Sequence, residues 1–131
     1  MKLIIAGSRE FTDYKLLANT LKAEGFSTDT VDTVVSGCAH GADKLGEKWA
    51  VAQGIPIARF PADWDSYGKR AGFIRNGEMA EYADACIVFW NGTSKGTKHM
   101  IDIAKRKAGM RLVVVTVTPV NFVNLSLKDL S

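Results

Sequence analysis

The chain has 131 residues, 47% of them hydrophobic, which suits one compact domain with a buried core. Its formal net charge of +3 is too small to indicate nucleic-acid binding by itself. No stretch approaches the ~20 apolar residues that a membrane-spanning helix requires, so we expect no membrane partner.

Short apolar runs alternate with segments of helical periodicity along the whole chain. In chain order, these patterns predict a strand at 3–6, a helix at 14–24, a strand at 31–35, a helix at 42–53, a strand at 55–60, a loop at 61–69, a helix at 70–82, a strand at 85–90, a helix at 97–108 and a strand at 112–117. Pro56 near the start of the third strand favours an edge position, where its missing N–H does no harm. Residues 118–131 alternate weakly and are interpreted as a C-terminal extension, either a short strand or a cover for the core.

Alternating strands and helices indicate an α/β fold with a mainly parallel sheet. Right-handed crossovers and a chain of this length favour a Rossmann-like, doubly wound sheet of five strands with helices on both faces. We expect residues 1–131 to form a single domain. Ligands of such sheets bind beyond the carboxyl ends of the strands, where the strand order reverses.

The two cysteines, Cys38 and Cys86, belong to no CxxC pair, which argues against a zinc site and against a disulfide scaffold. We therefore expect reduced thiols and no metal, and we expect no cofactor. The N-terminus enters an apolar run at Leu3 and lacks the long apolar segment and cleavage site of a signal peptide. These features favour a cytoplasmic protein.

Three loops rich in small residues follow predicted strands. They are Gly7-Ser8-Arg9-Glu10, Ser36 to Asp43 and Asn91 to Thr97. Because all three fall at predicted carboxyl ends, we expect them to meet at one edge of the sheet and to form one site. Arg9 comes directly after a buried strand, where it can contact a phosphate or carboxylate through two N–H groups. The alternative for Arg9 is a salt bridge to Glu10 or Asp13.

The loop at 36–43 can hold a phosphate or ribose, because little side chain covers its backbone N–H groups and a helix begins beside it. An ordinary strand-to-helix turn would favour the same glycines. The loop matches neither the GxGxxG motif nor the Walker A motif. The loop at 91–97 is a second candidate binding loop for a phosphate or ribose, and Thr97 in it can cap the next helix. Lys95 or Lys98 can either screen a phosphate there or remain in solvent.

The segment at 61–69 carries two aromatic residues, Trp64 and Tyr67, which can stack on a base or pack the loop onto the core. In the helix that follows, Arg75 and Asn76 diverge by about 100°. At most one of the two is therefore expected to point straight into a pocket, unless the helix begins there. Cys38 has no recognisable base beside it, which argues against a nucleophilic role.

Four motifs occur in order: G-S-R-E-F, V-V-S-G-x-A-x-G-A-D, F-P-A-D-W with Y-G-K and R-N, and F-W-N-G-x-S-x-G-T. Over about residues 2 to 115 the chain resembles the SLOG superfamily, most closely its small stand-alone branch related to YspA and YpsA, often found in phages and bacteria. The resemblance implies a Rossmann-like domain that binds nucleotides or nucleotide-derived ligands. Its best-known relatives are the Lonely Guy phosphoribohydrolases, which cleave nucleoside monophosphates, and the DNA-processing protein A family, which binds single-stranded DNA.

The resemblance implies ligand-binding roles residue by residue. The positions that match its three loop signatures are Gly7, Ser8, Arg9, Ser36, Gly37, Ala39, Gly41, Ala42, Asp43, Gly92, Ser94, Gly96 and Thr97. To these we add Trp64, Arg75 and Asn76 as candidate ligand contacts.

The chain departs from the Lonely Guy pattern at one position. The motif P-G-G-x-G-T-x-x-E of those enzymes ends in a glutamate that assists glycosidic cleavage, and here this position is Met100. Asp102 lies two residues further on and faces about 200° away on an ideal helix. Phosphoribohydrolase activity would therefore need Glu10, Asp43 or Asp63 to substitute. The catalytic residues remain unassigned, with Asp43 and Asp63 as candidates.

We expect a module that binds a nucleotide or nucleotide-derived ligand, such as a nucleoside phosphate or an ADP-ribose-like molecule, in a sensor or regulatory role. The alternatives are a nucleoside-phosphate N-glycosidic hydrolase and a single-stranded DNA-binding protein. DNA binding is not favoured, because the DNA-processing relatives carry extra domains and a charge of +3 offers little phosphate-neutralising surface. A homo-oligomer formed through Phe73, Ile74 and the region of Met79 is left open.

Overall fold

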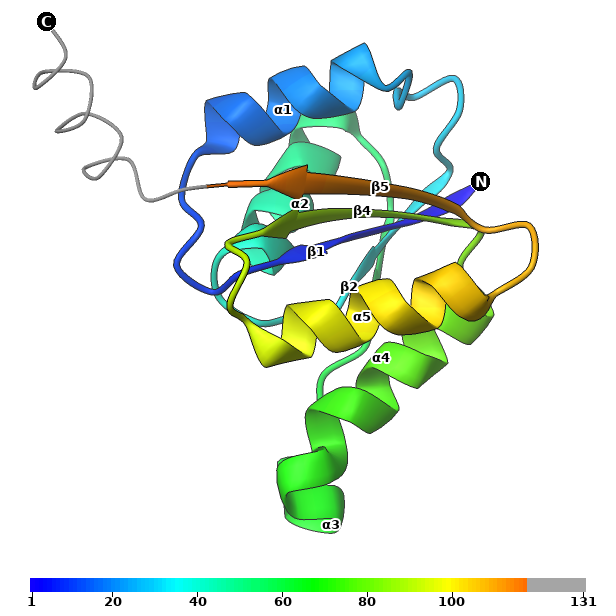
Figure 1. Cartoon of the computed structure of the whole chain (residues 1–131). Coiled ribbons are helices and arrows are strands. Elements are labelled where there is room, and N and C mark those ends of the chain that lie inside the picture. Colours follow the sequence, from blue (N-terminus) through cyan, green and yellow to red (C-terminus); the bar gives the residue numbers. More distant parts are fainter. Residues whose placement is uncertain (118–131) are drawn as a thin grey trace, which may run out of the picture.

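The predicted apolar runs pair into one parallel five-stranded sheet, in the order β3-β2-β1-β4-β5 (Figure 1). The computed structural model describes residues 1–117, and the expected C-terminal extension lies outside the described residues. The strands are β1 (Lys2–Gly7), β2 (Thr33–Ser36), β3 (Ile57–Arg59), β4 (Ala85–Trp90) and β5 (Arg111–Thr116). The central strands β1 and β4 are buried on both faces, as their continuous apolar runs predict.

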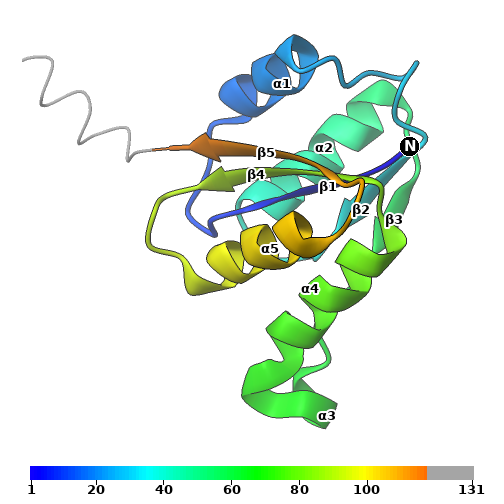
Figure 2. The same ribbon diagram turned by 45° about the vertical axis from the view of Figure 1, so that its right-hand side comes forward.

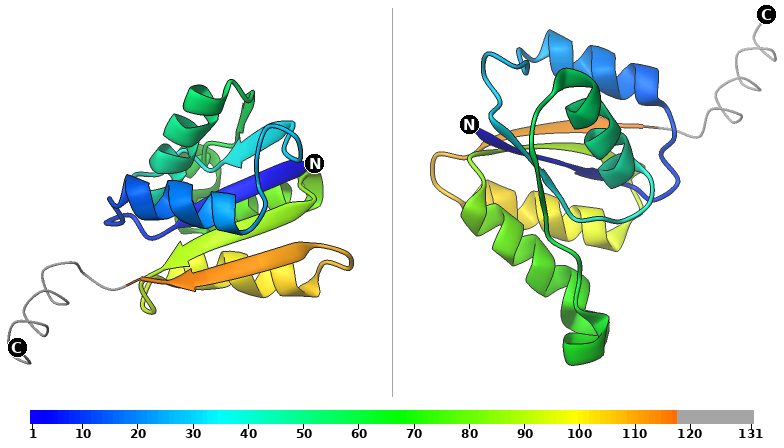
Figure 3. Two further views of the ribbon diagram at one scale, coloured as in Figure 1. Left: turned by 90° about the horizontal axis from the view of Figure 1, so that it is seen from above. Right: turned by 180° about the vertical axis from the view of Figure 1, so that it is seen from behind.

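Helices cover both faces of the sheet, which confirms the doubly wound α/β fold (Figure 3). Helices α1 (Tyr14–Ala23) and α2 (Ala42–Gln53) lie on one face, and α4 (Ala71–Tyr82) and α5 (Lys95–Arg106) lie on the other. Side chains from alternate positions of the same strands enter the two resulting cores. Leu3 and Ile5 pack on the α1–α2 side, whereas Ile4 and Ala6 pack on the α4–α5 side.

The strand order reverses between β1 and β4, next to the middle of the sheet. The chain runs from β1 through β2 to β3 at one edge and then returns to place β4 on the other side of β1. The register pairs Gly7 of β1 with Phe89 of β4, so that the two strands end side by side. This is the place where doubly wound sheets bind ligands. Strand β3, which Pro56 precedes, lies at the edge as predicted.

Residues 61–69, predicted as a loop, contain the short helix α3 (Trp64–Tyr67), and the 3-10 helix η1 (Gly68–Arg70) follows it directly. Asp63 begins α3 by accepting a hydrogen bond from the N–H of Ser66 at 3.1 Å. The segment projects beyond the sheet at the start of α4 (Figures 1 and 2). Within it, Trp64 keeps 52% of its surface exposed.

Helix α5 begins two residues earlier than its periodicity predicts, and the prediction that Thr97 caps it is wrong. Ser94 is the cap, because its hydroxyl accepts a hydrogen bond from the backbone N–H of Thr97 at 3.4 Å. Thr97 is buried within the first turn. The hydroxyl of either Ser94 or Thr97 could accept a hydrogen bond from the free N–H groups at the helix N-terminus. The turn from Asn91 to Ser94 places Ser94 at the capping position. Its Asn91 side chain accepts from the N–H of Ser94 at 2.9 Å.

Candidate functional site

Two adjoining cavities lie beyond the carboxyl ends of the central strands. The first, here called the α4–α5 cavity, has a volume of about 240 Å³. Its lining comes from the end of β1 and the loop after it, from the loop after β2 and the first turn of α2, from α3, η1 and α4, and from the start of α5. The lining residues are Ala6, Gly7, Arg9, Ala39, Asp43, Trp64, Lys69, Gly72, Phe73, Arg75, Asn76, Met79, Ser94, Gly96, Thr97 and Met100. The cavity thus occupies the point at which the strand order reverses.

The second cavity, here called the β2–α2 cavity, has the same volume of about 240 Å³. It is lined by Arg9, Gly37, Cys38, Ala39, His40, Pro61, Ala62, Trp64 and Arg75. Arg9, Ala39, Trp64 and Arg75 line both cavities and form the wall between them.

The structure brings the three predicted loops together at one edge of the sheet. The predicted ligand contacts that line the α4–α5 cavity are Gly7, Arg9, Ala39, Asp43, Trp64, Arg75, Asn76, Ser94, Gly96 and Thr97. Gly37 lines the β2–α2 cavity. Five others line neither cavity: Ser8, Ser36, Gly41, Ala42 and Gly92.

Ser8 and Gly41 join the loops to one another from inside the protein. The Ser8 hydroxyl accepts a hydrogen bond from the N–H of Asn91 at 3.0 Å, and its carbonyl oxygen accepts one from the N–H of Ala42 at 3.3 Å. Gly41 has a φ of +77°, and a Cβ there would come within 3.0 Å of the carbonyl oxygens of Ser8 and Arg9. The backbone of the protein itself, and not a ligand, therefore requires glycine at this position.

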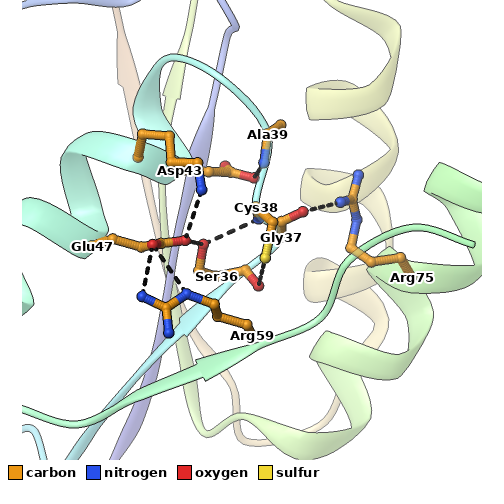
Figure 4. A network of polar contacts seen from close by, with 9 residues as sticks. Ser36, Gly37, Cys38, Ala39, Asp43, Glu47, Arg59 and Arg75 are labelled. Atoms are coloured by element: carbon orange, nitrogen blue, oxygen red, sulfur yellow. Dashed lines mark hydrogen bonds and ion pairs between the residues drawn. The ribbon is translucent and has the colours of Figure 1, made fainter.

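Ser36 belongs to a polar network beneath the β2–α2 loop (Figure 4). Its hydroxyl donates to Glu47 Oε2 at 2.6 Å and accepts from the N–H of Cys38 at 3.1 Å. Arg59 Nε donates to the other carboxylate oxygen of Glu47 at 3.2 Å. Burial alone would raise the pKa of Glu47, but the hydrogen bonds from Ser36 and Arg59 and the nearby cations hold it below its usual value. This network holds in place the loop between β2 and α2, which lines the β2–α2 cavity.

Gly37 of the loop at 36–43 and Gly96 of the loop at 91–97 differ in what surrounds them. A Cβ at Gly37 would lie 2.8 Å from both Arg75 Nη1 and Asp43 Oδ2, so glycine there makes room for the protein's own side chains. A Cβ at Gly96 would have no atom within 4 Å, although Gly96 lines the α4–α5 cavity. Gly96 is thus a position where bare backbone faces open cavity.

Arg75 and Asn76 both line the α4–α5 cavity, whereas their helical spacing predicts that only one would. The long Arg75 side chain folds back over its neighbour, and its Nε donates to Asn76 Oδ1 at 3.0 Å. Its Nη1 donates to the carbonyl oxygen of Gly37 (Figure 4). Asn76 Nδ2 in turn donates to the carbonyl oxygen of Gly96 at 3.2 Å and lies 3.2 Å from Nδ1 of His99. Asn76 therefore positions Arg75 and ties α4 to α5.

Asp43 is the only carboxylate that lines either cavity within residues 1–117. Its side chain lies in the first turn of α2, and Oδ2 accepts a hydrogen bond from the N–H of Ala39 at 3.1 Å. Burial raises the pKa of Asp43 to about 6, and the Ala39 hydrogen bond and the charge of Arg75 oppose the rise. Asp63, the second catalytic candidate, lines neither cavity and caps α3 instead.

Positive charge predominates around the α4–α5 cavity, where Arg9, Lys69 and Arg75 face the single carboxylate of Asp43. Among residues 1–117, Arg9 makes no ion pair, so the expected alternative of a salt bridge to Glu10 or Asp13 does not occur. Both carboxylates have other contacts. Glu10 accepts a hydrogen bond from the Asn91 amide. The Asp13 carboxylate caps α1. The guanidinium of Arg9 is therefore available to an anionic ligand.

Several residues that line the cavities were not predicted as ligand contacts, among them Lys69 and Phe73 of the α4–α5 cavity. Lys69 lies in the quoted Y-G-K motif, and Phe73 lies three residues before Asn76, a spacing that places both on one side of a helix. Phe73 is 47% exposed, and its ring centroid is 4.5 Å from that of His99. Met79, considered for self-association, is instead buried in the core.

Comparison with known proteins places this site in a family. A family model described as "YspA, cpYpsA-related SLOG family" matches residues 1–67. Gene 61 protein of Mycobacterium phage D29 is 35% identical over 118 residues, which cover 86% of this chain and 94% of that protein. The chain belongs to this SLOG family. No solved structure is significantly similar to it.

The family match includes the first two loops of this SLOG protein and ends before the loop at 91–97. The structure places that third loop beside the other two. Met100, which occupies the position of the Lonely Guy glutamate, is buried and lines the α4–α5 cavity. Asp102 lines neither cavity and pairs with Lys98 at 3.0 Å. Neither residue supplies a carboxylate to the site.

No helix among residues 1–117 of the SLOG protein has the length and apolar character needed to cross a membrane. In the same part of the chain, no three side chains of His, Cys, Asp or Glu lie close enough together to hold a metal ion. Cys38 and Cys86 are free thiols.

Proposed function

We propose that this SLOG protein binds a nucleotide or a nucleotide-derived ligand at the two cavities, in a sensor or regulatory role. The observation that carries the proposal is the lining of the α4–α5 cavity, which combines the cations of Arg9, Lys69 and Arg75 with the rings of Trp64 and Phe73. Guanidinium and ammonium groups suit phosphate oxygens, and aromatic faces suit a base. Membership of the SLOG family supports the same ligand class. The free thiols suit a reducing compartment such as the cytoplasm.

Ligand binding should raise the thermal midpoint of unfolding, by a free energy of a few kcal/mol at saturating ligand. AMP, ADP and ADP-ribose are suitable probes, and calorimetric titration gives their affinities. We expect Arg9→Gln to weaken binding roughly 10- to 100-fold, because a hydrogen bond to a charged group is worth ~1.5–3 kcal/mol. The exposed Arg9 side chain has no ion pair within residues 1–117, so this variant should fold normally.

Arg70→Gln is the matched control, because Arg70 is exposed, carries the same charge and lines neither cavity. A loss confined to Arg9→Gln would assign the effect to the site, whereas equal losses would assign it to net charge. The proposal fails if none of the three probes stabilises the wild-type protein, or if the two variants bind alike.

Asp43 favours a second candidate function, a nucleoside-phosphate N-glycosidic hydrolase. A carboxyl group with a pKa of about 6 can donate a proton to a leaving base near neutral pH, and this one lines the cavity. If the protein is such an enzyme, incubation with AMP should release adenine, detected by chromatography, and Asp43→Asn should abolish the release. Asp63→Asn should leave it unchanged, because Asp63 lines neither cavity. Intact AMP, together with intact ADP and ADP-ribose, would exclude this candidate and leave the binding role standing.

A further inference from the structure

A chain of hydrogen bonds runs from the start of α5 to the wall that the two cavities share. His99 of α5 lies against Asn76 of α4, with His99 Nδ1 3.2 Å from Asn76 Nδ2. The Asn76 amide oxygen accepts from Arg75 Nε at 3.0 Å, and Arg75 Nη1 donates to the carbonyl oxygen of Gly37. Arg75 lines both cavities, whereas His99 lines neither. His99 is thus placed to affect the site without contacting a ligand.

The orientation of the Asn76 side-chain amide follows from its partners. Arg75 Nε can only donate, so it faces the amide oxygen. The carbonyl oxygen of Gly96 can only accept, so it faces the amide nitrogen at 3.2 Å, and the second N–H of that nitrogen is left for His99. Turning the amide over would set donor against donor at Arg75 and acceptor against acceptor at Gly96. Asn76 is only 5% exposed, too little for water to compensate such a mismatch.

The amide nitrogen of Asn76 requires an acceptor at His99 Nδ1. A neutral imidazole provides one when its proton is on Nε2, whereas a charged imidazole donates from both nitrogens. Protonated His99 would therefore place an N–H against the N–H of Asn76. The Phe73 ring, whose centroid is 4.5 Å from that of His99, limits how far the imidazole can turn away. Protonation of His99 thus removes its hydrogen bond to Asn76 and leaves an N–H of this buried amide without a partner.

The surroundings of His99 favour the neutral ring. Burial lowers the pKa of His99, the charge of Arg106 lowers it further, and Asp102 opposes both effects. These two charged residues share α5 with His99. Helix α4 faces the ring with uncharged side chains, and its cation, Arg75, lies on the far side of the Asn76 amide. The neutral form, which can hold Asn76, therefore predominates at neutral pH.

We propose that neutral His99 is a positioning residue of the site: it holds the Asn76 amide, and the amide holds Arg75 in the wall between the cavities. Protonation of His99 loosens Arg75, so the wall is ordered at neutral pH and loosened in acid. The hold on Arg75 depends only on contacts within the protein, whereas its effect on ligand binding rests on the proposed function.

NMR spectroscopy of the isotope-labelled protein tests the hydrogen-bond chain without any ligand. At neutral pH the ring nitrogens of His99 should show the tautomer with its proton on Nε2. On acidification, the side-chain amide signals of Asn76 and the Nε–H signal of Arg75 should shift with the same midpoint as the His99 ring, below the ordinary pKa of 6.5. His40, the second histidine of the chain, is the internal control, and its titration should leave the Asn76 signals unchanged.

Three variants separate the titration of His99 from that of Asp43, whose pKa of about 6 lies in the same range. His99→Asn keeps an acceptor in the place of Nδ1 but cannot be protonated, so the His99 step should disappear and the Asp43 step remain. Asp43→Asn should do the reverse. His99→Phe keeps a ring beside Phe73 and has no acceptor, so the Asn76 and Arg75 signals should lie at their acid positions even at neutral pH.

Calorimetric titration with ADP measures the consequence for binding. At neutral pH, His99→Phe should bind ADP roughly 2- to 10-fold more weakly than the wild type, the effect of losing one neutral hydrogen bond, and His99→Asn should restore most of that affinity. Asn76 signals that do not follow the His99 titration, a proton on Nδ1 at neutral pH, or equal ADP affinities for His99→Phe and the wild type would overturn the proposal. Absence of ADP binding to the wild type would count against the proposed function alone, and the NMR titration would still decide whether His99 holds Asn76.

Discussion

Replacing Gly41 by alanine is expected to cost more than about 3 kcal/mol of stability. The added Cβ would be forced within 3.0 Å of the carbonyl oxygens of Ser8 and Arg9, and it would have to adopt a φ of +77°. The Ser8 carbonyl cannot easily retreat, because it accepts hydrogen bonds from the N–H groups of Phe11 and Ala42. The thermal midpoint should fall by roughly 10 °C or more in a calorimetric scan.

Gly54→Ala is the control that separates backbone strain from steric overlap. Gly54 ends α2 with a φ of +71°, but a Cβ there would have no atom within 4 Å. Gly54→Ala should therefore be destabilised only by the roughly 1–2 kcal/mol that a left-handed conformation costs an alanine. Equal losses for the two variants would show that the loops after β1 and β2 do not press against each other as the structure indicates.

Asp43→Asn is expected to change how stability depends on pH, by up to about 3 kcal/mol. The folded protein holds the pKa of Asp43 at about 6, above the ordinary value of 3.8 that applies to the unfolded chain. The folded state therefore binds this proton more tightly, and the wild type loses stability as the pH rises from 3.8 towards 6. Asparagine stays neutral throughout. The free energy of unfolding of the variant, relative to that of the wild type, should therefore rise across this interval and stay constant above it.

Urea unfolding at several pH values between 4 and 8 measures this difference. Asp102→Asn provides a control of opposite sign, because the hydrogen bond from Lys98 lowers the pKa of that exposed carboxyl. The Asp102 carboxylate contributes stability at neutral pH that is lost on acidification. The free energy of unfolding of Asp102→Asn, relative to that of the wild type, should therefore fall slightly as the pH rises. Parallel stability profiles for the wild type and Asp43→Asn would contradict the burial of an ionisable Asp43 beside Arg75.

The pH profile also bears on ligand binding. A phosphate against Arg75 would approach the Asp43 carboxylate as well, because both residues line the α4–α5 cavity. Protonation of Asp43 below about pH 6 removes that repulsion. Asp43 can thus tune the affinity of the site for anions in addition to its candidacy as an acid.

Sequence patterns were sufficient for the fold. Continuous apolar runs such as Leu3 to Ala6 are typical of strands buried on both faces, and Pro56 marked the edge strand. These are local properties of the chain, and the alternation of strands and helices restricts their assembly to few topologies. The helical segment at 64–70 was not predicted, because its start depends on the single cap made by Asp63.

By itself, the sequence determined that small-residue loops follow the strands, that these strands run in parallel, and hence that the loops meet at one edge. Only the tertiary structure decided which of their residues face open space. Ser8 bonds to Asn91, Gly41 packs under Arg9, and Gly37 accommodates Arg75, whereas Gly96 faces the cavity. Each of the first three contacts joins residues far apart in the chain, and a motif of small residues looks the same whether a ligand or the protein's own backbone lies against it.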